Sequence, residues 1–77
     1  MNRTVLITGG SSGLGAAVVA AVTKESDVPV VLDRVPPAAG VDHELVDLAD
    51  TVATAAAVAE LSRRSGGIDA VVTAAGI

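Results

Sequence analysis

A glycine-rich turn between an apolar run and a helical pattern constrains the fold more than any other feature of the chain. The run Val5-Leu6-Ile7 is followed by glycines at positions 9, 13 and 15, and then by a stretch rich in alanine and valine. Such a turn leaves backbone N–H groups unpaired where the positive end of the helix dipole lies. Glycine permits a sharp turn at Gly9, ligand approach at Gly13 and close helix packing at Gly15. The sequence therefore predicts a phosphate-binding turn between a strand and a helix.

The rest of the chain predicts three more strands and a second helix. The unbroken run of β-branched and leucine residues within 3–8 is typical of a strand that is buried on both faces. Further strands are predicted at residues 30–33, 43–46 and 68–73. One helix begins near residue 13, capped by Ser11 or Ser12, and ends before residue 26; the other spans residues 50–65. Pro36-Pro37 and Gly40 make residues 34–41 a loop. Helical spacing predicts two buried helix faces, formed by Leu14, Ala17, Val18, Ala21 and Val22, and by Val52, Ala55, Ala56 and Ala59.

An acidic residue follows the second apolar run. Asp33 lies eighteen residues after Gly15, close to the roughly 20-residue spacing at which a carboxylate holds the ribose hydroxyls of a dinucleotide. An ionised carboxylate accepts both hydroxyls and repels a 2′-phosphate, whereas Arg34 could bind that phosphate. Charge geometry therefore favours NAD, with NADP as the less favoured alternative.

Two other interpretations of the glycine turn were weighed. The spacing from Gly10 to Gly15 also fits the phosphate loop G-x-x-x-x-G-K-[ST], but Ala16-Ala17 stand where that loop requires lysine and a hydroxyl. The sequence thus excludes a nucleoside triphosphatase of this type. The simpler alternative is an ordinary strand–helix turn with solvated carboxylates at the strand ends.

The turn at residues 8–15 reads T-G-x-x-x-G-x-G, and with it the whole chain resembles the amino-terminal half of the short-chain dehydrogenase/reductase family. Three further matches follow in the family's order: Asp33 after the second strand, Asp47-Leu48 after the third, and residues 73–76 after the fourth. The last match departs from the family's N-N-A-G, because Thr73 and Ala74 replace the two asparagines.

The resemblance implies an α/β fold: the incomplete amino-terminal half of a Rossmann fold, with a parallel sheet in the order 3-2-1-4. Residues 1–77 would be the cofactor-binding portion of a truncated domain. Asp47 would meet the adenine amino group, Leu48 the adenine ring, and the backbone around Ala74 the nicotinamide-side ribose. The implied cofactor-binding residues are Gly9, Ser11, Ser12, Gly13, Leu14, Gly15, Asp33, Arg34, Asp47, Leu48, Ala74, Ala75 and Gly76.

The family's catalytic S…Y-x-x-x-K arrangement is missing from the sequence, which has no tyrosine and only one lysine, Lys24. The full-length protein is expected to transfer a hydride between NAD and an alcohol or carbonyl substrate, while this chain alone is expected to be inactive and to have no catalytic residue. The alternative is a non-catalytic nucleotide-binding module or an inactive gene fragment. The exposed edge of the fourth strand predicts self-association, and so a possible homo-oligomer.

Composition excludes several other partners. The net charge is −4 and the five basic residues are scattered, which gives no patch for nucleic acid. The sequence has no cysteine and a single histidine, His43, so no metal site is expected. No apolar run approaches the ~18 residues of a membrane span, and a cytoplasmic protein is expected.

Overall fold

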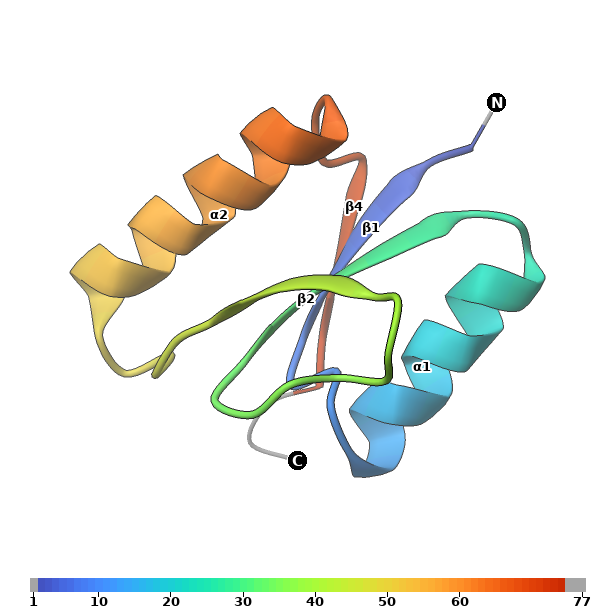
Figure 1. Ribbon diagram of the computed structural model, residues 1–77, viewed down its shortest axis with the longest axis horizontal. Helices are drawn as coiled ribbons and strands as arrows, with labels where there is room; N and C mark the ends of the chain where they lie inside the picture. Colours follow the sequence, from blue (N-terminus) through green and yellow to red (C-terminus); the bar gives the residue numbers. More distant parts are fainter. Residues whose placement is uncertain (1, 75–77) are drawn as a thin grey trace.

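The computed structural model of the protein describes residues 2–74, which form a parallel four-stranded sheet with one helix on each face (Figure 1). The strand order is β3-β2-β1-β4, so the predicted α/β class and sheet order are confirmed. Residues 34–41 contain no helix, as predicted. The elements are β1 (Thr4–Thr8), α1 (Gly13–Lys24), β2 (Val28–Asp33), β3 (Asp42–Leu45), α2 (Thr51–Ser65) and β4 (Ala70–Thr73).

The strand boundaries differ from the prediction by one or two residues: β1 begins at Thr4, β3 spans Asp42–Leu45, and β4 begins at Ala70. Backbone pairing and capping explain two further differences. β2 begins at Val28 rather than residue 30, since Val28 pairs with Thr4 at the start of β1. Asp50 is not the first residue of α2 but its N-cap, with the side chain accepting a hydrogen bond from the backbone N–H of Ala53 at 3.0 Å.

Apolar side chains form two cores, one on each face of the sheet. Because side chains alternate along a strand, neighbouring residues of β1 enter different cores: Ile7 lies with Val19 of α1, and Leu6 lies with Leu61 of α2. Ile7 and Leu61 are completely buried. The core on the α1 face comprises Val5, Ile7, Val19 and Val31, and the core on the α2 face comprises Leu6, Val30, Leu32, Ala57 and Leu61.

The predicted buried face of α2 was wrong, and that of α1 was right only in part. Val18 and Val22 pack against the core on the α1 face, whereas Ala17 and Ala21 are exposed. In α1 the fully buried residues are Gly15 and Val19, while Leu14 is 56% exposed. In α2 they are Ala57 and Leu61, while Val52 is 80% exposed. The larger apolar side chain decides the α2 face, because burying leucine removes more apolar area from water than burying alanine. The α1 face is decided by the close approach of the helix at the glycine turn.

The carboxyl end of α1 has a serine in a conformation that favours glycine. Ser26 has φ 64°, and its N–H donates to the Thr23 carbonyl at 3.0 Å. The next N–H, from Asp27, donates to the Val22 carbonyl at 3.1 Å. These bonds form the Schellman motif, which usually places glycine at the left-handed position. The corresponding position after α2 is Gly66, with φ 83°.

Replacing Ser26 by glycine is therefore expected to stabilise the fold by about 1 kcal/mol, because a Cβ in the left-handed region costs about that much. Chemical denaturation followed by circular dichroism measures the change. The opposite exchange, Gly66→Ser, is the matched control and should destabilise by a similar amount. A Ser26→Gly variant no more stable than the parent chain would contradict the assignment of strain to Ser26.

Candidate functional site

The carboxyl ends of all four strands border one pocket of about 410 Å³. Ligands of open α/β sheets bind in the crevice outside these strand ends. The pocket is lined by Gly9, Ser12, Gly13, Leu14, Gly15, Asp33, Arg34, Asp47, Leu48 and Ala74. Every lining residue was predicted as a cofactor-binding residue. Of the other predicted residues, Ser11 lies beside the pocket and bonds to Asp33, whereas Ala75 and Gly76 lie outside the described residues.

The glycine turn needs its glycines for different reasons. Gly9 and Gly13 have positive φ angles of 76° and 57°, which glycine adopts without a steric penalty. At Gly13 a Cβ would meet no atom within 4 Å, so that backbone faces open space in the pocket. At Gly15 a Cβ would lie 1.7 Å from the Gly9 carbonyl oxygen. The predicted close packing at Gly15 is therefore present, but the partner is the turn itself rather than the sheet.

A further glycine of the turn was missed by sequence reasoning. Gly10 stands at a variable position of the motif, yet a Cβ there would lie 2.7 Å from a methyl carbon of Val31 and 3.2 Å from one of Val19. Gly10 is buried and holds the turn close to the α1 core. The only signal in the sequence was the pair Gly9-Gly10.

The first turn of α1 is available to an anion. Ser12, one of the two predicted caps, is the N-cap residue, but its side chain makes no capping hydrogen bond. The neighbouring hydroxyl, of Ser11, donates instead to the Val35 carbonyl. The first turn of the helix contains no acidic residue. The N–H groups at this end of α1, and the positive end of the helix dipole, thus face the pocket without a side-chain acceptor among residues 2–74.

Asp33 ends β2 and is bonded to the glycine turn. Its Oδ2 accepts a hydrogen bond from the Ser11 N–H at 3.0 Å, and its Oδ1 accepts one from the Arg34 N–H at 2.6 Å. Partial burial acts to raise the pKa of Asp33, but the hydrogen bonds from Arg34 and Ser11 outweigh it, and the net effect is a pKa below its ordinary value. Asp33 is therefore a carboxylate at neutral pH.

The loop between β3 and α2 supplies the opposite wall. Asp47 accepts a hydrogen bond on Oδ1 from the Ala49 N–H at 3.0 Å, and its carbonyl accepts one from the Asp50 N–H at 2.9 Å. These bonds fix the turn that presents Asp47 to the pocket. Leu48 packs partly against the α2 core and also lines the pocket. The two side chains give this wall one charged and one apolar contact.

The arrangement suits a ligand with a phosphate at one end and hydroxyl or amino groups at the other. The amino-terminal end of α1, which has no side-chain cap, attracts negative charge. Asp33 and Asp47 are hydrogen-bond acceptors that repel negative charge. His43 does not line this pocket; its Nδ1 lies 3.0 Å from the Val41 carbonyl oxygen. Among residues 2–74, no group of three or more histidine or acidic side chains is placed to bind a metal ion. Over the same residues, no helix has the length and apolar character to cross a membrane.

No protein-family model matches the chain, and a search of curated proteins finds no significant match.

Proposed function

We propose that this chain binds NAD through the pocket at the strand ends, as the amino-terminal part of an oxidoreductase similar to the short-chain dehydrogenases/reductases. The observation that carries the proposal is the placement of two opposite features in one pocket. The uncapped end of α1 lies on one side, and the ionised Asp33 lies at the end of a neighbouring strand. A dinucleotide needs both, because its pyrophosphate is anionic and its adenosine ribose offers two hydroxyl donors.

Each part of the cofactor has a candidate partner. The backbone N–H groups of residues 13–15 would hold the pyrophosphate, and Asp33 would accept from the ribose hydroxyls. Asp47 and Leu48 would contact the adenine, and the backbone at Ala74 the ribose on the nicotinamide side. The pocket volume of about 410 Å³ lies within the range of roughly 300–1,000 Å³ typical of small-molecule sites. The cofactor would supply a hydride acceptor or donor for an alcohol or carbonyl substrate.

A non-catalytic nucleotide-binding module is the second candidate. It is favoured by one observation: the sequence contains no tyrosine and a single lysine, Lys24, which lies at the far end of α1 from the pocket. Hydride transfer to or from an alcohol needs a proton donor or acceptor with a suitable pKa. Both candidates predict NAD binding, and they differ in whether hydride transfer occurs.

Titration of the purified chain with NAD, NADP and AMP by isothermal calorimetry tests the proposal. NAD is expected to bind more tightly than NADP, because Asp33 repels the 2′-phosphate, and AMP is expected to bind because it carries a phosphate and the adenosine. The Ser26→Gly variant is a useful control, since Ser26 lies at the end of α1 remote from the pocket. If this stabilised variant binds neither NAD nor AMP, the proposed function is wrong.

A further inference from the structure

The strand that leads into the adenine wall of the pocket contributes few apolar contacts of its own, although the flanking Val41 and Val46 pack against the two cores. β3 is an edge strand and pairs only with β2 among the described strands. Its only apolar residue, Leu45, is 55% exposed. Immediately after it, the Val46 N–H donates to the Asp33 carbonyl at 2.8 Å, and Asp47 and Leu48 enter the pocket. The position of this wall therefore depends both on the packing of Val46 and Leu48 against the α2 core and on what holds β3 in place.

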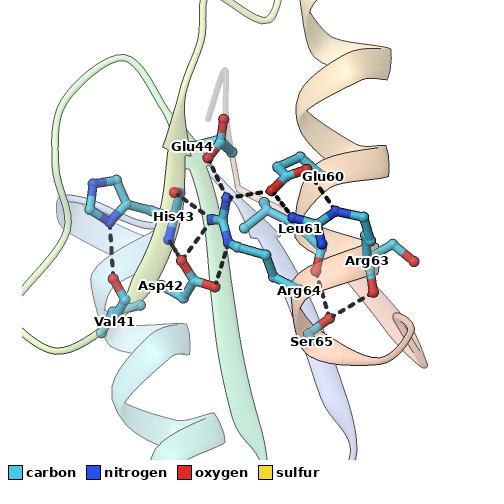
Figure 2. A network of polar contacts seen from close by, with 10 residues as sticks. Val41, Asp42, His43, Glu44, Glu60, Leu61, Arg63, Arg64 and Ser65 are labelled. Carbon is cyan, nitrogen blue, oxygen red and sulfur yellow. Dashed lines mark hydrogen bonds and ion pairs between the residues drawn. The ribbon is translucent and has the colours of Figure 1, made fainter.

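Arg64, near the end of α2, forms hydrogen bonds and ion pairs with β3 (Figure 2). Its guanidinium forms a bidentate pair with the Asp42 carboxylate, with Nη2–Oδ1 at 2.7 Å and Nε–Oδ2 at 3.2 Å. Its Nη1 donates to Glu44 Oε2 at 2.7 Å, and its Nη2 donates to the carbonyl of His43 at 3.1 Å. Asp42 and Glu44 are two residues apart and so lie on the same face of the strand. One side chain thus holds three consecutive residues of β3.

The network around Arg64 restricts its own conformation. Glu60, one turn earlier on α2, lies 3.4 Å from Arg64 Nη1 and also bonds to Arg63. The Arg64 side chain is 30% exposed, whereas that of Arg63 is 71% exposed. The hydrogen bond from Arg64 is the largest cause of the lowered pKa of Asp42. Isolated surface ion pairs contribute little, but a bidentate pair within a network is the exception.

We infer that Arg64 is a positioning residue of the nucleotide pocket: by fixing β3 against α2, it sets where Asp47 and Leu48 stand. The inference rests on the proposed function for its binding consequences. The loop of residues 46–50 joins β3 to α2 at one end of these two elements. Arg64 lies at the other end, where no loop connects them, and its hydrogen bonds link α2 to β3 there. Arg64 does not line the pocket.

The test compares Arg64→Met, which keeps an apolar stem of similar length, with Arg63→Met. Arg63 is a matched control, because it neighbours Arg64 and its ion pair is with Glu60 of the same helix. Arg64→Met is expected to weaken NAD binding about five-fold, within the range of couplings carried by such networks, and Arg63→Met to leave it unchanged. Arg64→Lys should bind NAD more tightly than Arg64→Met but less tightly than the parent chain, because lysine keeps the positive charge and loses the bidentate geometry of the guanidinium.

Amide hydrogen exchange provides a readout that does not depend on NAD. In Arg64→Met, exchange should accelerate at Val46 and Asp50, whose N–H groups donate to the carbonyls of Asp33 and Asp47. It should not accelerate at Gly9 of the glycine turn, whose N–H donates to the Leu32 carbonyl in β2. Equal exchange in the two methionine variants would overturn the inference, as would acceleration at all three amides, which indicates a general loss of stability. If the parent chain does not bind NAD, the proposed function fails and the exchange comparison still decides the role of Arg64.

Discussion

Gly15→Ala is expected to weaken NAD binding at least about 100-fold, equivalent to roughly 2.7 kcal/mol, and to destabilise the fold by about 2 kcal/mol. Helix propensity alone predicts the opposite sign for stability, since alanine exceeds glycine by about 1 kcal/mol within a helix. The new Cβ would lie 1.7 Å from the Gly9 carbonyl oxygen and 2.9 Å from the Cα of Gly10. The turn and α1 must therefore separate by more than about 1 Å, because packed interiors leave no room for such an approach. The N–H groups of residues 13–15 would then no longer converge on one anion.

The control for Gly15→Ala is Ala17→Gly, an exposed substitution on the same helix. It should lower stability by about 1 kcal/mol through propensity alone and leave NAD binding unchanged. Urea denaturation and calorimetric titration, both at a temperature at which each variant is folded, separate the two effects. A Gly15→Ala variant that is more stable than the parent chain and binds NAD normally would show that the close approach of α1 to the turn is not required.

The sheet order could be predicted from the family resemblance and the right-handed crossover rule, and the pocket could be predicted because its residues are marked by short-range signals. A glycine turn after β1 and the carboxylates after β2 and β3 are visible as sequence features. In a parallel sheet, the carboxyl ends of neighbouring strands meet at one edge. The side chains of Asp33 and Asp47 are therefore brought together once the strand order is known. Binding of NAD by this pocket stays a prediction.

The buried face of α2 could not be predicted, because nearly every residue in the middle of this helix is small and apolar. In such a stretch, helical spacing is compatible with several different buried faces. Only the packing of Leu61 with Leu6 in the folded protein determines which face is buried. The Arg64 cluster was missed for a related reason. Arg64 is one of two adjacent basic residues in the last turn of α2, where a cation suits the helix dipole, so its position along the chain indicates no further role. Its partners Asp42 and Glu44 lie 22 and 20 residues earlier in the chain, and only the folded sheet brings them to it.

Asp33 carries a role in the structure that its position in the sequence did not indicate. Sequence reasoning assigned it to the ribose hydroxyls. In the structure the same carboxylate also accepts hydrogen bonds from the N–H groups of Ser11 and Arg34, and so ties the glycine turn to the end of β2. Two substitutions separate these roles. Asparagine keeps an acceptor oxygen for the Ser11 N–H and removes the charge, whereas alanine removes both.

Asp33→Ala is therefore expected to weaken NAD binding about 50-fold, and to weaken NADP binding less. NAD loses the ribose acceptor and the ordered turn, whereas NADP loses the ordered turn but is relieved of the repulsion of its 2′-phosphate. Asp33→Asn should also lower the preference for NAD, but NADP affinity should not fall, because the bond to the turn is kept. Calorimetric titration of the three chains with both cofactors gives the affinities. If neither variant changes the ratio of NAD to NADP affinity, Asp33 does not contact the adenosine ribose.

The pH dependence of NAD binding provides an independent measure of the same carboxylate. The pKa of Asp33 is lowered in the folded chain, so its ionised form contributes stability that is present above the unfolded pKa of about 3.9 and is lost as the pH falls through the folded value. Binding by the parent chain is expected to be constant between about pH 8 and pH 5 and to decline only below about pH 4. The affinity of Asp33→Asn, whose side chain does not titrate, should show a smaller decline over the acidic range. A midpoint near neutral pH in the parent chain would mean that a group other than Asp33 controls binding.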